Sequence, residues 1–196
     1  MSSVSTLTLP ILMSNPAADL QSFIVFWSRL YAYNNAEQYQ IIHKKELAQD
    51  DLIELYTWKN GMKLSAKKKE SLSTNILGAV DEINRLRSSL TVDLDNFLIR
   101  FSKVSTVWKI FLLHICKPKV YPIYDQHIHR AYMYIHNKDY SGISSTMSEK
   151  KKLDFYFMQY LPFVEALKVK DMKKMDEAFF AFGQFLNTKN QHLLVK

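Results

Sequence analysis

Apolar residues recur every three to four positions along most of the chain, which is the spacing of an α-helix with one buried face. The clearest apolar faces are Leu20, Phe23, Ile24, Trp27 and Leu30, then Leu72, Ile76, Ala79, Ile83 and Leu86, and finally Met172, Met175, Phe179, Phe182 and Leu186. The alternation of apolar and polar positions that marks a half-buried strand is hard to find. The pattern therefore predicts an all-α protein.

Capping residues predict where the helices start and stop. Asn, Asp, Ser and Thr stand before the periodic segments, where their side chains accept hydrogen bonds from free N–H groups, and Gly or Pro follows several of them. The helices expected on this basis run from Asn15-Pro16 to about Tyr33, from Asp50 or Asp51 to about Trp58, from Ser65 to about Leu90, from Asp93 to about Phe101, from Ser105 to about Cys116, from Gln126 to His136, from a capping box at Thr146–Glu149 to about Lys168, and from Asp171 to Leu186. One compact domain over residues 1–196 is expected, either undivided or formed by two lobes with a cleft between them.

The composition agrees with a helical, intracellular protein. Hydrophobic residues occupy 47% of the 196 positions, and only 4 Gly and 5 Pro are available for the many tight turns of a β-rich fold. The single Cys116 excludes an internal disulfide, a multi-cysteine zinc site and an iron–sulfur cluster. The N-terminus does not read as a signal peptide, and the apolar segment Phe23–Trp27 is too short to span a bilayer. We therefore expect a soluble, cytoplasmic monomer with no membrane partner.

The net charge of +7 and the pI of about 9.3 favour a partner that carries phosphate groups, because cationic side chains bind nucleic acid with release of counterions. The lysines form three runs, at 67–69, 150–152 and 168–174. Each run by itself is also what an ordinary solvated helix face shows. Charge therefore makes nucleic acid a candidate partner and does not identify it.

The segment Phe101–Ala131 has the most informative pattern. It reads as a helix end, a tight turn, an apolar helix, a proline-bounded extended stretch and then Asp125 at a helix start. A turn before a helix N-terminus presents successive backbone N–H groups, which can bind a phosphate, and Lys103 and Lys109 add positive charge beside it. The aromatic neighbours Tyr121 and Tyr124 limit the solvation of Asp125, so that its charge can act on a developing cation.

This segment resembles the helix-hairpin-helix DNA glycosylases, the endonuclease III-like group. The residues Asp125-Gln126-His127-Ile128-His129-Arg130 match the family signature D-x-H-[IV]-x-R, in which the aspartate is catalytic. The hairpin pattern L-P-G-V-G-R-K-T-A can be placed on Phe101–Lys109 without a gap, with Val104 at the central valine. The family's lysine place then falls on Val107, 18 positions before Asp125, as in that group. The resemblance covers about 30 residues, with the hairpin-like element at about 101–109 and the aspartate segment at about 118–131.

The chain departs from the family in three places. The two hairpin glycines are Lys103 and Ser105, which changes the phosphate-binding turn, and the lysine that forms a Schiff base in bifunctional members is Val107. The cysteines that hold the cluster of iron–sulfur members are missing. The resemblance therefore implies a monofunctional enzyme without a cofactor, and the sequence predicts no metal site.

The resemblance also implies roles for individual residues. Asp125 would be catalytic, whereas Lys103, Val104, Ser105, Lys109 and His127 would contact DNA, and Trp58, Tyr121 and Tyr124 would line a pocket for a flipped base. Each has a simpler interpretation as well. Asp125 can be a helix N-cap alone, His127 a solvated helix residue, and Trp58 part of the core.

The function expected from the resemblance is hydrolysis of the N-glycosidic bond of a damaged or modified base, which leaves an abasic site. Ordinary DNA repair is one setting. Removal of a bulky modified base, such as those of some phage genomes, would make the protein an antiviral defence enzyme. Two alternatives remain open: a nucleic-acid-binding protein that kept the scaffold without catalysis, and a protein-interaction module with a basic surface.

Overall fold

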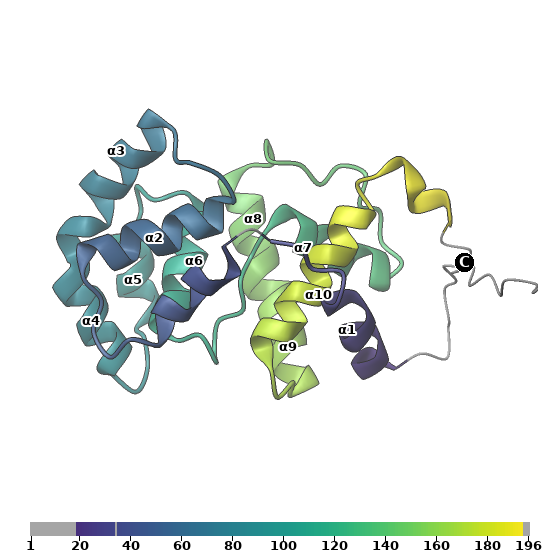
Figure 1. Ribbon diagram of the computed structural model, residues 1–196, viewed down its shortest axis with the longest axis horizontal. Helices are drawn as coiled ribbons and strands as arrows, with labels where there is room; N and C mark the ends of the chain where they lie inside the picture. Colours follow the sequence, from purple (N-terminus) through teal and green to yellow (C-terminus); the bar gives the residue numbers. More distant parts are fainter. Residues whose placement is uncertain (1–18, 34, 194–196) are drawn as a thin grey trace, which may run out of the picture.

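The computed structural model describes residues 19–33 and 35–193, and all regular elements in that part of the chain are helical (Figure 1). The α-helices are α1 (Leu20–Ser28), α2 (Gln49–Asn60), α3 (Ala66–Asn75), α4 (Val80–Ser88), α5 (Leu94–Arg100), α6 (Thr106–Cys116), α7 (Gln126–Ile135), α8 (Glu149–Phe155), α9 (Leu161–Leu167) and α10 (Met172–Phe185). Short 3₁₀ segments lie at Ala36–His43, Leu77–Ala79 and Lys189–Leu193, and a π-helical turn at Tyr156–Tyr160 joins α8 to α9. The predicted all-α class is confirmed for this part of the chain.

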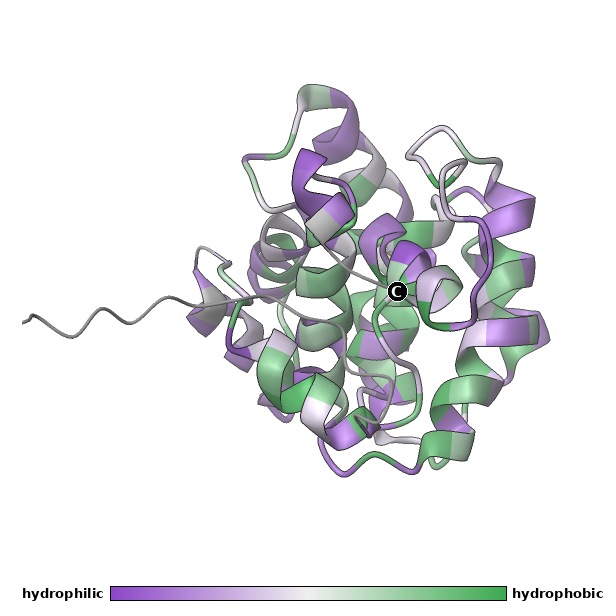
Figure 2. Ribbon diagram, turned by 90° about the vertical axis from the view of Figure 1, so that its right-hand side faces the viewer, coloured by the Kyte–Doolittle hydropathy of each residue, from purple (hydrophilic) through white to green (hydrophobic). Residues whose placement is uncertain are grey.

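The helices α2 to α6 lie together on one side of the molecule, and α1 and α7 to α10 lie on the other (Figure 1). In the second group α10 packs against both α1 and α7. The helix α6 packs against α4 in its own group and against α8 in the other, so it joins the two. Apolar stretches gather in the middle of the molecule and polar ones toward its periphery (Figure 2). A core of this kind is the main source of folding free energy.

Several predicted helix boundaries are confirmed. Asp93, Asp125 and Asp171 are N-caps whose side chains accept hydrogen bonds from backbone N–H groups in the first turns of α5, α7 and α10. Gly61 ends α2 with φ +71°, the left-handed conformation that favours glycine. The predicted faces are also confirmed at Ile76 and Phe179, which are fully buried.

Other boundaries differ from the prediction. The first helix begins at Leu20, with Asp19 as its cap, and it ends at Ser28. Leu30, which we expected in the core, is 53% exposed because it follows the helix end. The expected start at Asn15-Pro16 lies outside the described residues.

The long helix expected from Ser65 to about Leu90 is broken. At Ile76 the backbone leaves the helical region, with φ −126° and ψ −50°, and a 3₁₀ turn then separates α3 from α4. Asn75 and Gly78, which are poor helix formers, lie on either side of the break. The apolar period continues across it, so periodicity alone did not reveal it.

The C-terminal half contains two further differences. The helix that begins at Glu149 is capped by Ser148 and not by Thr146, because the Ser148 hydroxyl accepts from the Lys151 N–H. The helical run then includes the π turn, which contains one residue more than an α-turn would. The 3₁₀ segment Ala36–His43 was not predicted at all.

The contact between α7 and α10 depends on Gly183. A Cβ atom on Gly183 would lie 1.8 Å from the carbonyl oxygen of His127, so only glycine fits at this point. Because His127 is in the first turn of α7, the close approach also fixes the position of the residue that caps this turn, Asp125.

Candidate active site

Asp125 lies at the start of α7 in extended backbone conformation, with φ −152° and ψ 159°. One carboxylate oxygen, Oδ1, accepts the N–H of His127 at 2.8 Å. The other, Oδ2, lies 3.4 Å from Nζ of Lys59, at the end of α2. The two side chains are 21% and 6% exposed, so this ion pair is largely shielded from solvent. The cap and the ion pair together fix the orientation of the carboxylate.

A cavity of about 310 Å³ opens beside Asp125. Its wall combines the end of α2, the start of α6, the residues around Asp125 and the start of α8, and it includes Lys59, Ser105, Val107, Tyr124, Asp125 and Lys152. Ser105 and Val107 belong to the hairpin-like segment, which the structure therefore brings next to Asp125. Most of the remaining wall consists of polar side chains such as Asn60, Gln126 and Ser145. The cavity is thus polar and is bordered by both charges of the Lys59–Asp125 pair.

The extended stretch before Asp125 is held by side chains from three different elements. Tyr121 O lies 2.7 Å from Nδ1 of His114 on α6, and Pro122 O accepts the hydroxyl of Tyr156 at 2.9 Å. The N–H of the next residue, Ile123, donates to the buried carboxylate of Asp176 on α10 at 3.0 Å. Three consecutive residues are therefore fixed to the core, and the chain reaches Asp125 with little freedom.

Burial changes the protonation of two of these supporting groups. It lowers the pKa of His114 to about 4, so the ring is neutral at pH 7. It raises the pKa of Asp176 to about 7, with the Ile123 N–H and Lys173 acting in the opposite direction. Asp176 therefore titrates near neutral pH while it holds the main chain two residues before Asp125.

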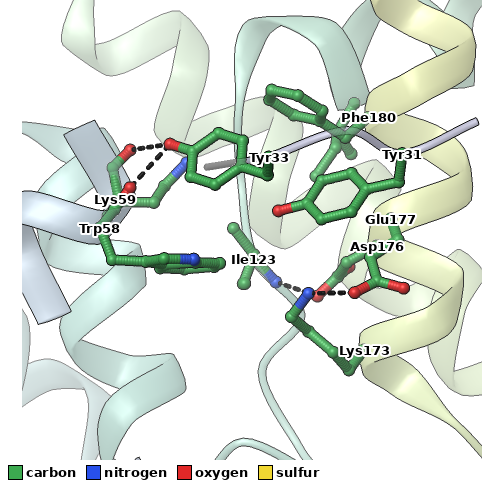
Figure 3. A pocket seen from close by; sticks show the side chains of 10 residues that line it. Tyr31, Tyr33, Trp58, Lys59, Ile123, Lys173, Asp176, Glu177 and Phe180 are labelled. Carbon is green, nitrogen blue, oxygen red and sulfur yellow. Dashed lines mark hydrogen bonds and ion pairs between the residues drawn. The ribbon is translucent and has the colours of Figure 1, made fainter. Parts of the chain in front are cut away.

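A second, much smaller cavity of about 30 Å³ lies on the other side of Lys59 (Figure 3). Trp58 and Tyr33 line it, and the Tyr33 hydroxyl donates to the carbonyl of Trp58 at 2.7 Å. Lys173 lies over the ring of Trp58, 5.5 Å from its centroid, and forms an ion pair with Glu177. The space is enough for one or two water molecules and not for a base.

The residues expected to line a base pocket are separated by the structure. Trp58 is 5% exposed and borders the small cavity, where it packs on Tyr39 and Phe111. Tyr124 borders the large cavity, and its hydroxyl lies 3.1 Å from Nδ1 of His129. Tyr121 is 7% exposed and borders neither of these two cavities. Of the three, Tyr124 alone lies beside Asp125 in the large cavity.

The residues expected to contact DNA are also placed differently from one another. Lys103 and Ser105 are exposed at the turn, whereas the Val104 side chain is buried and its N–H donates to Phe101 O at 3.0 Å. Lys109 is only 8% exposed, and burial lowers its pKa, so the phosphate contact expected of it does not fit its position. His127 is half-buried, with Nδ1 3.0 Å from the Arg130 guanidinium.

The start of α6 already holds an anion. The N–H of Thr106 donates to the carboxylate of Glu149 at 2.5 Å, and the Thr106 hydroxyl donates to the Glu149 carbonyl at 3.1 Å. Glu149 also forms an ion pair with Lys152 at 2.7 Å. The phosphate site expected at this helix start is therefore occupied by a side chain of the protein itself.

Three residues of this site were not found from the sequence: Lys59, Asp176 and Glu149. Lys59 is 66 positions from Asp125 along the chain, and Asp176 is 53 positions from Ile123. Neither belongs to a local motif. Glu149 was recognised as part of a capping box, but nothing in its sequence neighbourhood shows that it caps a second helix, α6.

Within the part of the chain that the structure describes, no three His, Cys, Asp or Glu side chains are grouped so that they could hold a metal ion. In the same residues no helix has both the length and the apolar character needed to cross a membrane. Comparison with known proteins gave no match to a family model, to a curated protein or to a solved structure.

Proposed function

We propose that this protein is a DNA glycosylase that hydrolyses the N-glycosidic bond of a flipped-out base, with Asp125 as its catalytic carboxylate. The observation that carries the proposal is the position of Asp125, at a helix start in the wall of a 310 Å³ cavity and beside Val107 of the hairpin-like segment. A cavity of this volume is within the range that binds small ligands, and it can receive one nucleobase.

The chemistry follows from the charge of the carboxylate. As the bond from the sugar to the base breaks, positive charge develops on the sugar, and a fixed carboxylate stabilises that charge. Asp125 can then accept a proton from the water that attacks the sugar. Val107 has no nucleophilic atom, so water is the nucleophile and an abasic site is the product.

The polar wall of the cavity bears on the substrate. Lysine, amide and hydroxyl groups border the cavity, among them Lys152, Gln126 and Ser145. Such groups suit a base with several hydrogen-bonding substituents, because buried polar groups need partners. Bulky modified bases of the kind found in some phage genomes meet this description, which would make the protein a defence enzyme. Repair of ordinary damage is the alternative substrate class.

The test is incubation with a panel of duplex and single-stranded DNAs that carry damaged or hypermodified bases, followed by alkali cleavage at abasic sites. We expect cleavage with the wild-type protein and none with Asp125→Asn. Salt-dependent DNA binding without abasic sites on any member of the panel would favour a non-catalytic nucleic-acid-binding protein. Absence of salt-dependent binding would favour a protein-interaction module.

A further inference from the structure

Lys59 is the residue closest in charge and position to Asp125, and the resemblance gave it no role. Its side chain is 6% exposed, it borders the large cavity, and its ammonium lies 3.4 Å from the Asp125 carboxylate. Its main chain is held in place, because the Tyr33 hydroxyl donates to the carbonyls of Trp58 and Lys59 and because Gly61 ends α2 directly afterwards. Lys59 is thus a positioned cation at the cavity wall.

The ion pair leaves part of the ammonium group free. A lysine has three N–H donors, and the Asp125 carboxylate is the one side-chain acceptor that Lys59 has among the described residues. At 3.4 Å this contact is also longer than a strong charged hydrogen bond. The remaining donors are available to a group that enters the cavity.

Cleavage of an N-glycosidic bond separates charge in the same sense as this pair. The sugar becomes positive, and the base takes the electron pair of the bond and becomes negative. Fixed charges that match a charge-separated transition state stabilise it without reorganisation. A carboxylate beside the sugar and an ammonium beside the base form such an arrangement.

We propose that Lys59 is a second catalytic residue, whose ammonium donates a proton to an acceptor atom of the departing base. The proposal rests on the proposed function. The Lys59 proton goes to the base as the C–N bond breaks, and water adds to the sugar while its proton goes to Asp125. Transfer of that proton from Asp125 to Lys59, which are neighbours, restores both groups. The net reaction consumes one water and releases the neutral base.

The position of Lys59 also predicts the substrate class. A base that leaves with a negative charge gains from an ammonium donor, whereas a base that is already cationic, such as an N-alkylated purine, leaves without one and is repelled by it. The protein should therefore act on uncharged bases with a ring-nitrogen or carbonyl acceptor and discriminate against cationic alkylated bases.

The first experiment compares single-turnover release of hypoxanthine, an uncharged base, with release of 7-methylguanine, a cationic one. Lys59→Gln should lower hypoxanthine release by about 10²-fold, as loss of other transition-state donors does, and should leave 7-methylguanine release unchanged or faster. Asp125→Asn should lower both. Lys68→Gln is the matched control, because Lys68 borders the same cavity but bonds to Asn60, and it should affect both bases alike and weakly. An equal loss on both bases in Lys59→Gln would overturn the proposal, since Lys59 would then act only by positioning Asp125.

The second experiment does not depend on the identity of the base. An oligonucleotide with a positively charged pyrrolidine in place of one deoxyribose imitates the cationic sugar. Lys59→Gln should bind it more tightly than the wild type, and Asp125→Asn more weakly, while all three proteins bind unmodified DNA alike. Unchanged or weaker pyrrolidine binding by Lys59→Gln would contradict a site beside the reacting bond. Failure of the wild type to make abasic sites on any DNA would instead refute the proposed function. Thermal melts of each variant exclude loss of folding as the cause.

Discussion

The carboxylate of Asp176 accepts the main-chain N–H of Ile123 at 3.0 Å, two residues before Asp125. The two aspartates belong to different helices and serve different ends: Asp176 is buried and holds the backbone, whereas Asp125 borders the cavity. The catalytic proposal concerns Asp125, but its geometry depends on Asp176. Five predictions follow from this arrangement and its surroundings.

Asp125→Asn should remain folded and should bind DNA nearly as the wild type does, because asparagine is an equally good N-cap. Abasic-site formation should fall by about 10²-fold or more, because the charge that stabilises the sugar is lost. Alkali cleavage of the product DNA measures the rate, and circular dichroism checks the fold. Near-normal turnover in this variant would remove Asp125 from the mechanism.

Borohydride should trap no covalent complex between the wild-type protein and an abasic DNA, because Val107 has no amine and Lys59 acts on the base. Val107→Lys should introduce trapping, since position 107 borders the same cavity as Asp125. Denaturing electrophoresis detects the complex. A trapped wild-type complex that disappears in Lys59→Gln would show that Lys59 is a nucleophile.

Glu149→Gln should bind DNA roughly two- to five-fold more tightly, the effect expected of one charge at a helix end. The substitution removes the carboxylate that competes with phosphate for the Thr106 N–H, and it frees Lys152. Asp154→Asn is the matched control, because Asp154 also lies on α8 and has a similarly exposed side chain, at 49% against 53% for Glu149. Fluorescence anisotropy measures both. An equal gain in the two variants would show a general charge effect.

Asp176→Asn should change how stability depends on pH. Burial raises the pKa of Asp176 to about 7 from an ordinary value of 3.8, so the unfolded chain loses this proton at lower pH than the folded protein does. The wild type therefore loses stability relative to the variant as pH rises from about 4 to about 7, and the difference is constant above that. Urea unfolding at a series of pH values measures it. A difference that does not vary over this window would contradict the raised pKa.

Gly183→Ala should destabilise the protein by about 1–3 kcal/mol or more, because the new Cβ would overlap the carbonyl of His127 and force α7 and α10 apart. Gly78→Ala is the control, since a Cβ at Gly78 meets no atom within 4 Å. Its stability should change by less than about 1 kcal/mol. Calorimetry compares the two, and a Gly183→Ala protein as stable as the wild type would show that the helices can shift freely.

The sequence predicted what is encoded locally. The Asp125 cap needs only a side chain at the start of an apolar-periodic segment, and its 18-residue spacing from Val107 placed both residues on one segment that folds back on itself. The apolar faces of α6 and α10 could be read in the same way, from period alone.

What the sequence did not reveal depends on tertiary packing. The α2 end brings Lys59 to Asp125, and the α8 start brings Glu149 to Thr106, from 66 and 43 positions away. The break at Ile76 lies within an unbroken apolar period, and Lys109 is buried by neighbours that its own helix does not supply. Pairs of this kind have no spacing rule, so they appear only when the whole chain is folded.

The π turn at Tyr156–Tyr160 makes the site sensitive to chain length. With its surplus residue, both tyrosines face inward: Tyr156 donates to Pro122 O at 2.9 Å, and the Tyr160 hydroxyl lies 3.5 Å from the Asp176 carboxylate. Met158, between them, is 76% exposed, so its replacement by another side chain is tolerated. Its deletion would restore an α-turn and rotate everything beyond it by about 100°. Substitutions are therefore permitted in this turn, whereas a one-residue deletion would turn Tyr160 away from Asp176 and loosen the support behind Asp125.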